Sequence, residues 1–153
     1  KGFIFIGLIN VNDSPYVIEY NVRMGDPETQ VVLPRIKNDF LKILLAIENQ
    51  NLDQVELEIN PNHYANVVLA SKGYPESYNK GFVIKGIENI INSTVFHAGT
   101  LLKDNNVLTN GGRVISVVSS AENFKEALKK SYESIDLIEF DGKTYRKDIG
   151  FDL

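Results

Sequence analysis

The chain has 153 residues, of which 43% are apolar and 24% are charged, a balance typical of a globular protein with a hydrophobic core. Its net charge of −4 argues against a broad surface for nucleic acid, and the absence of cysteine excludes disulfides and thiolate metal sites. No segment approaches the roughly 20 apolar residues of a membrane helix, and the first ten residues lack the flanks of a signal peptide. We therefore expect a cytoplasmic protein with neither nucleic acid nor a membrane as its partner.

A β-hairpin is predicted at the start of the chain. Residues 2–9 form a continuous apolar run, which is typical of a strand covered on both faces. Residues 10–15 are rich in turn formers, and the apolar residues 16–18 begin a second strand. Because the chain enters this buried type of strand directly at Lys1, without a methionine, we expect it to be the C-terminal piece of a longer protein.

Three polar side chains at alternate positions continue the second strand. Glu19, Asn21 and Arg23 point the same way if the strand extends through them, since side chains of a strand alternate between its faces. A carboxylate and an amide offer the oxygen ligands that Mg²⁺ prefers, and a guanidinium can bind a phosphate or carboxylate through two hydrogen bonds. Two simpler interpretations stay open: a solvated strand face that binds nothing, and a surface ion pair of Arg23.

A turn and a helix start follow this strand. Gly25 suits the turn, Asp26 is placed as a helix cap, and Pro27 suits the first helical position. The free amides of such a helix start form an anion site, although capping alone explains Asp26. The helix is predicted to end at Leu33, before a proline.

A second helix is predicted from a cap at Asn38 or Asp39. Its apolar stripe consists of Phe40, Leu41, Leu44, Leu45 and Ile47. The polar residues 48–51 end it, and we place a domain boundary there, so that residues 1–50 and 51–153 form separate domains.

The second part shows short β-patterns and one long helix. Strands are predicted at residues 55–59, 65–70, 82–84, 94–98 and 113–118, a hairpin at 101–108, and a strand interrupted by an Asp-Gly turn at 138–145. Ser119 and Glu122 have the spacing of a capping box, which predicts a helix over residues 121–136. Its buried face consists of Ala127, Leu128 and Ile135, with Phe124 and Tyr132 as further candidates. Antiparallel strands with few helices indicate an α+β fold with a mainly antiparallel sheet.

The two histidines are not expected to bind a metal. His97 lies in an apolar strand pattern and is predicted to be a core residue, whereas His63 follows a proline and is predicted to lie in a loop. Neither is near another histidine in the sequence, so a zinc site is not expected. We find no set of residues typical of a serine or cysteine nucleophile, and no phosphate-binding P-loop.

Several motifs resemble one enzyme family. The run EYNVRMGDPETQVVLPR at residues 19–35 resembles the signature near the end of the ATP-grasp domain of phosphoribosylamine–glycine ligases, also called glycinamide ribonucleotide synthetases. Later segments resemble the same family in the same order: residues 69–75 (LASKGYP), 95–100 (VFHAGT), 109–114 (TNGGRV) and 145–150 (YRKDIG). The resemblance covers essentially the whole chain. It implies the last hairpin and helices of an ATP-grasp domain, followed by the small C-terminal domain.

The resemblance also implies a reaction. In this family ATP phosphorylates the carboxylate of glycine, and the amine of 5-phosphoribosylamine attacks the acyl phosphate to give glycinamide ribonucleotide, ADP and phosphate in purine biosynthesis. Such chemistry needs cations around the transferred phosphoryl group and exclusion of water from the acyl phosphate.

The family's functional residues can be transferred to matching positions. Glu19 and Asn21 match its magnesium or manganese ligands, and Arg23 is assigned to the charge of the phosphoryl or acyl-phosphate group. Four consecutive residues match the segment that shapes the substrate pocket in the family: Gly25, Asp26, Pro27 and Glu28. Arg113 follows two glycines in a segment similar to a loop that approaches the active site, although Asn-Gly-Gly alone is simply a turn.

Because the glycine-rich phosphate loop, most adenine-binding residues and the upstream substrate domain are missing, we expect no ligase activity from these residues alone. Two alternatives stay open. One is another ATP-grasp ligase that joins a carboxylate to an amine, and the other is a non-catalytic binding module that retains the fold.

Overall fold

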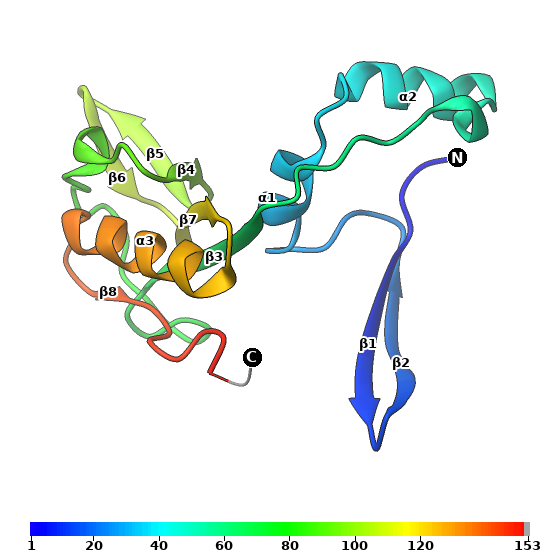
Figure 1. The fold of residues 1–153 in the computed structure, drawn as a ribbon. Helices are drawn as coiled ribbons and strands as arrows, with labels where there is room; N and C mark the ends of the chain where they lie inside the picture. Colours follow the sequence, from blue (N-terminus) through cyan, green and yellow to red (C-terminus); the bar gives the residue numbers. More distant parts are fainter. Residues whose placement is uncertain (152–153) are drawn as a thin grey trace. The chain divides into compact units, whose positions relative to one another are not determined.

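The computed structural model describes residues 1–151. Within these residues the chain divides into two compact units, one ending at Asn60 and the other starting at Pro61. Both units contain antiparallel β-structure together with helices, so the predicted α+β class is confirmed (Figure 1).

The first unit begins with the predicted hairpin. Strand β1 (Phe5–Val11) pairs antiparallel with β2 (Ser14–Asn21). The turn residues Asn12 and Asp13 have φ of 52° and 61°, a left-handed conformation that these residue types tolerate better than most. The turn residues of the sequence therefore set the position of the hairpin.

The pairing of the two strands is interrupted by a β-bulge. Gly7 lies opposite Glu19, whereas the next residue, Leu8, lies opposite Val17. One extra residue of β2, Ile18, is accommodated between these pairs. The bulge therefore immediately precedes Glu19.

Within the described residues the first strand is not covered on both faces, so the expectation of such cover stays a prediction. Ile6 and Leu8 on β1 keep about half of their surface, and Ile18 and Tyr20 on β2 keep 65% and 69%. In Figure 1 the hairpin is a two-stranded ribbon, whose strands pair with each other in one antiparallel ladder.

A short helix follows the turn after β2. Helix α1 (Thr29–Val32) continues into the 3₁₀ turn η1 (Leu33–Arg35). The residue at its N-cap is Glu28, whose side chain makes no capping hydrogen bond. The prediction of a cap at Asp26 with Pro27 at the first helical position is therefore wrong. A helix of four residues also lacks the length on which the predicted anion site depends.

Helix α2 (Phe40–Asn49) begins where it was predicted. The Asp39 carboxylate accepts a hydrogen bond from the amide of Leu41 at 2.9 Å. The helix buries Ile43 and Ala46, so the predicted apolar stripe is partly wrong. Three of its members are exposed rather than buried: Leu41, Leu44 and Leu45. The 3₁₀ turn η2 (Leu52–Gln54) follows the helix.

The end of the first unit is extended but is not the strand predicted at residues 55–59. Only Ile59 forms an isolated bridge, to Ile36. The Asn38 side chain holds the same segment, since its oxygen accepts the amide of Glu58 at 2.7 Å. These contacts extend the compact unit past the predicted boundary after residue 50, while the assignment of domains stays a prediction.

The second unit is built on an antiparallel sheet with the strand order β4-β7-β3-β8. Its strands are β3 (His63–Ser71), β4 (Thr94–His97), β7 (Arg113–Ala121) and β8 (Lys143–Thr144). The strands predicted at residues 65–70, 94–98 and 113–118 are confirmed as β3, β4 and β7. Of the strand predicted at 138–145, the structure shows β8 and an isolated bridge from Glu139 to Lys85.

The predicted hairpin of this unit is also confirmed. Strand β5 (Thr100–Lys103) pairs with β6 (Asn106–Thr109), and Asp104 and Asn105 form the turn with positive φ. The strand predicted at residues 82–84 is wrong, since only Val83 forms a bridge there. A further 3₁₀ turn, η3, spans Ile87–Asn89.

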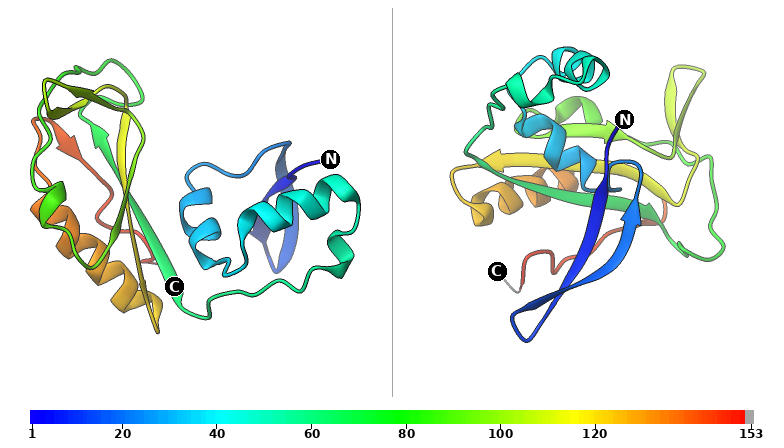
Figure 2. Two further views of the ribbon diagram at one scale, coloured as in Figure 1. Left: turned by 90° about the horizontal axis from the view of Figure 1, so that it is seen from above. Right: turned by 90° about the vertical axis from the view of Figure 1, so that its right-hand side faces the viewer.

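Helix α3 (Phe124–Leu137) lies along one face of the sheet (Figure 2). Its cap is Asn123, whose side chain accepts the amide of Glu126 at 2.9 Å, so the capping box predicted at Ser119 is wrong. Ser119 is instead buried in β7, where its hydroxyl bonds to those of Ser93 and Ser131.

The hydrophobic core lies between α3 and the sheet. Its buried residues are Val67, Leu69, Ile84, Val114, Ile115, Val117, Ile135, Ile138 and Phe140. Of the face predicted for α3, Ala127 and Ile135 are fully buried, while Leu128 and Tyr132 are partly buried. The helix therefore covers the sheet much as its pattern predicted.

Both histidine placements are wrong. His97 is exposed rather than in the core, and its Nδ1 lies 3.0 Å from the Thr100 hydroxyl. His63 is the first residue of β3 rather than part of a loop.

Candidate functional site

The candidate site begins with two neighbouring side chains at the end of β2. The amide nitrogen of Asn21 donates a hydrogen bond to the Glu19 carboxylate at 2.9 Å. Glu19 is exposed and Asn21 is half-buried. The predicted alternation is confirmed for this pair, since their side chains share one face of the strand.

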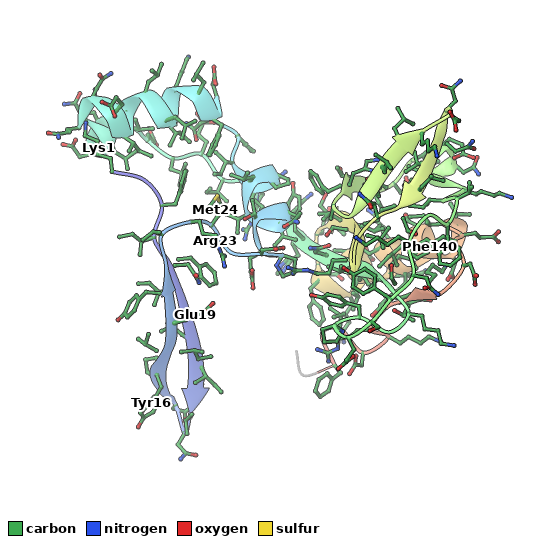
Figure 3. The ribbon with its side chains drawn as sticks, turned by 180° about the vertical axis from the view of Figure 1, so that it is seen from behind. Lys1, Tyr16, Glu19, Arg23, Met24 and Phe140 are labelled. Atoms are coloured by element: carbon green, nitrogen blue, oxygen red, sulfur yellow. The ribbon has the colours of Figure 1, made fainter. Side chains whose placement is uncertain are left out.

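Arg23 lies outside the strand. Strand β2 ends at Asn21, and the Arg23 guanidinium donates to the carbonyl of the adjacent Met24 at 2.9 Å. In Figure 3, Glu19 lies on the hairpin, while Arg23 and Met24 lie in the segment that leads toward α1. The prediction that Arg23 continues the strand face is therefore wrong, and its role toward a phosphoryl group stays a prediction.

The side chains of Glu28 and Phe5 approach Gly25 closely. A Cβ at this buried position would lie 2.6 Å from a carboxylate oxygen of Glu28 and 2.8 Å from the ring of Phe5. Its carbonyl also accepts the amide of Thr29 at 3.0 Å and the Thr29 hydroxyl. Only glycine fits this position without displacing a neighbour.

Phe5 connects this turn to the strand pair. It lies directly opposite Asn21 in the hairpin, and its ring reaches the space beside Gly25. The structure thus brings Glu19, Asn21, Gly25 and Glu28 into one continuous region of the first unit. The turn formed by Asp26, Pro27 and Glu28 completes it, and the Asp26–Pro27 peptide is cis.

The chemistry of these donors fits a divalent cation. Glu19 offers a carboxylate and Asn21 an amide oxygen, both hard ligands, and a half-turn of the amide would exchange its nitrogen for its oxygen. Mg²⁺ usually takes one or two carboxylates and completes its coordination with water and substrate phosphates. Among the described residues there is no cluster of three or more His, Cys, Asp or Glu with metal-binding geometry.

Sequence reasoning missed Gly7. It lies directly opposite Glu19, and a Cβ placed on it would lie 3.1 Å from Cγ of that side chain. A lone glycine in an apolar strand pattern is a signal for a bulge or a close approach. That signal is present in the sequence, but it does not name the partner.

The predicted loop residue Arg113 lies in the second unit. It is the half-buried first residue of β7, opposite Ala70. The carbonyls of the two glycines before it accept hydrogen bonds from the amide and hydroxyl of Ser71 at 2.8 and 2.9 Å. A Cβ on Gly112 would overlap the Tyr74 ring, so this loop has a structural role whether or not Arg113 contacts a substrate.

Comparison with known proteins identifies the relatives of this chain. The sequence model of the family described as "Phosphoribosylglycinamide synthetase, C domain" matches residues 64–152. Phosphoribosylamine–glycine ligase of Caldanaerobacter subterraneus is 44% identical over 149 residues, which are 97% of this chain and 36% of the relative. A bifunctional purine biosynthetic protein of Schizosaccharomyces pombe is 43% identical over 97% of this chain and 19% of its own length.

A solved structure agrees with these relatives. The crystal structure of phosphoribosylamine–glycine ligase from Thermotoga maritima superposes with a TM-score of 0.80 at 37% identity, over 97% of this chain and 37% of that chain. The fold and the match to the family model define the second unit as the C domain of a synthetase. The chain belongs to the phosphoribosylamine–glycine ligase family.

The chain spans about a third of the length of most of these relatives. Within residues 1–151, no helix combines the length and apolar character needed to cross a membrane.

Proposed function

We propose that this chain is part of an ATP-dependent ligase that joins glycine to 5-phosphoribosylamine in the cytoplasm. The products are glycinamide ribonucleotide, ADP and phosphate, and the reaction passes through an acyl phosphate of glycine. Family membership over 97% of the chain supports the proposal, and so do the relatives' names, phosphoribosylamine–glycine ligase and purine biosynthetic protein.

The observation that carries the proposal is the pair of oxygen donors on β2. Glu19 and Asn21 lie side by side on one face of the strand, with the amide nitrogen of Asn21 2.9 Å from a carboxylate oxygen of Glu19. They would hold Mg²⁺ or Mn²⁺, which supplies positive charge against the phosphates of ATP when bound. The protein's contribution is to hold these two oxygens at one end of a hairpin, next to the turn that contains Gly25.

The remaining residues would act on the substrates. The Arg23 guanidinium is exposed and could turn from the Met24 carbonyl toward a phosphoryl or acyl-phosphate oxygen, where a fixed positive charge stabilises the transition state. The turn at Asp26, Pro27 and Glu28 would shape the pocket for glycine or phosphoribosylamine. Arg113 would bind an anionic group of a substrate from the second unit.

We also propose that residues 1–153 alone do not catalyse the ligase reaction. The chain spans about a third of the matched relatives, and the remaining parts of the protein would supply the other contacts to ATP and the substrate domain. The exposed apolar side chains of β1 and β2 are suited to packing against those parts. Formation of glycinamide ribonucleotide by residues 1–153 alone would contradict this.

The experiment that tests the function uses the full-length enzyme in a host that lacks its own ligase. Asn21→Ala should abolish growth without added purine, and turnover in vitro should fall by on the order of 10–100-fold through weaker metal binding. Asn10→Ala is the matched control, since this asparagine is exposed on β1 of the same hairpin. Growth of Asn21→Ala at the wild-type rate would overturn the metal role.

A further inference from the structure

The space in front of Glu19 exists because β1 carries no side chain there. Directly opposed residues of an antiparallel pair project from the same face of the sheet. Gly7 is the residue opposed to Glu19, and Phe5 is the residue opposed to Asn21. On this face the candidate metal ligands therefore meet one aromatic ring and one vacant position.

A methyl group at position 7 would reach the Glu19 side chain. The Cβ of an alanine would lie 3.1 Å from Cγ of Glu19, closer than an ordinary van der Waals contact, while its other neighbours are 3.7 Å or more away. The Glu19 side chain is exposed and can move, whereas the strand backbone is held by the ladder. The Glu19 side chain would consequently have to shift by a few tenths of an ångström, which would move its carboxylate relative to the Asn21 amide.

The bulge adds to this arrangement. Because Ile18 is the extra residue of β2, the pairing resumes at Glu19, and every residue from Glu19 to Asn21 has a partner on β1. Bulges of this kind bend a strand and redirect the side chain beside them. The direction of Glu19 is thus set from both sides, by the bulge before it and by the glycine across from it.

We propose that Gly7 is a positioning residue for the metal site, one that keeps the Glu19 carboxylate beside Asn21. The inference rests on the proposed function, because it assumes that Glu19 binds the divalent cation. Gly7 acts through Glu19 and touches neither substrate nor metal.

The test measures metal binding rather than turnover. The full-length enzyme is titrated with Mn²⁺ at saturating non-hydrolysable ATP analogue, and free Mn²⁺ is followed by electron paramagnetic resonance. Gly7→Ala should raise the Kd for Mn²⁺ by on the order of tenfold, as loss of a residue that orients a ligand does. Ile6→Val is the matched control, since Ile6 is adjacent on β1 and faces the other side of the hairpin, opposite Tyr20.

A double-mutant cycle separates positioning from a general effect on the fold. In an enzyme that already carries Glu19→Ala, the Gly7→Ala change should leave the Kd for Mn²⁺ unaltered, because the side chain through which it acts is gone. An equal effect of Gly7→Ala in both backgrounds would overturn the inference. An unchanged Kd in the Gly7→Ala single variant would overturn it as well.

Two further outcomes are decisive. If Glu19→Ala itself binds Mn²⁺ like the wild type, the proposed metal role fails, and the inference fails with it. If Gly7→Ala does not fold, Glu19→Ala should restore folding by removing the Cγ atom that the new methyl group meets. A double variant that stays unfolded would contradict the proposed contact.

Discussion

The hairpin of the first unit and the sheet of the second unit use similar apolar residues in different ways. In the sheet, Leu69 and Ile115 are completely buried beneath α3, whereas isoleucines of the hairpin such as Ile6 and Ile9 keep about half of their surface. An isolated two-stranded hairpin is at best marginally stable in water. The second unit therefore contains its own source of stability, while the hairpin that carries Glu19 and Asn21 does not.

The comparison predicts its largest effect for a core substitution. In residues 1–153, Ile115→Ala should lower the free energy of unfolding by about 2–5 kcal/mol, since it leaves a cavity in a fully buried position. Ile9→Ala, on the half-exposed strand β1, should change it by less than about 0.5 kcal/mol. Urea unfolding followed by circular dichroism measures both. A loss from Ile9→Ala as large as that from Ile115→Ala would show that the hairpin is buried in solution.

The two helix caps allow a comparison with the same chemistry in each unit. Asp39→Ala and Asn123→Ala each remove a side chain that accepts an amide of the first turn, and each should destabilise its helix by about 1 kcal/mol. Because α3 covers the core and α2 buries few residues, the loss should appear as global destabilisation for Asn123→Ala and as local fraying for Asp39→Ala. Hydrogen exchange of the two helices separates these patterns. The same pattern for both variants would contradict the difference between the units.

The smallest predicted effect is a pH dependence near the end of the chain. The Arg146 guanidinium donates to both carboxylate oxygens of Asp148 at 2.9 Å, which lowers the pKa of Asp148 below its ordinary value of 3.8. A lowered pKa in the folded state means that this contribution to stability is present above pH 3.8 and is lost as the pH falls through the folded-state pKa.

Because both side chains of the pair are exposed, the effect should be small and should weaken with salt. The pKa measured by NMR titration should rise toward 3.8 in Arg146→Gln, with Lys147→Gln as the control. If the pKa of Asp148 does not change in Arg146→Gln, the pairing of Arg146 with Asp148 is contradicted.

The parts of the fold that were predictable from the sequence are those set by local patterns. Turn residues placed both hairpins, and the apolar period of α3 predicted which of its residues face the sheet. The start of α3 was not predictable in this way. Ser119 and Asn123 each precede a glutamate by three positions, and only the burial of Ser119 among other hydroxyl groups decides between them.

Contacts between distant segments explain the other errors. The alternation at residues 55–59 is that of a strand, but within this segment only Ile59 forms a β-bridge. In the candidate site, the period of a strand predicted that Glu19 and Asn21 share a face, and it failed for Arg23 because β2 ends at Asn21. Gly7 was missed because its contribution is the absence of a side chain, and the register that brings it opposite Glu19 becomes visible only in the paired strands.

The most direct test of the central claim is a crystal structure of the full-length enzyme with ADP and Mn²⁺, with data collected for the anomalous signal of manganese. The account predicts a manganese peak about 2.1 Å from an oxygen of Glu19 and from the amide oxygen of Asn21, with a phosphate oxygen among the other ligands. A manganese peak on the nucleotide that is coordinated by other residues, with Glu19 and Asn21 out of reach, would contradict it.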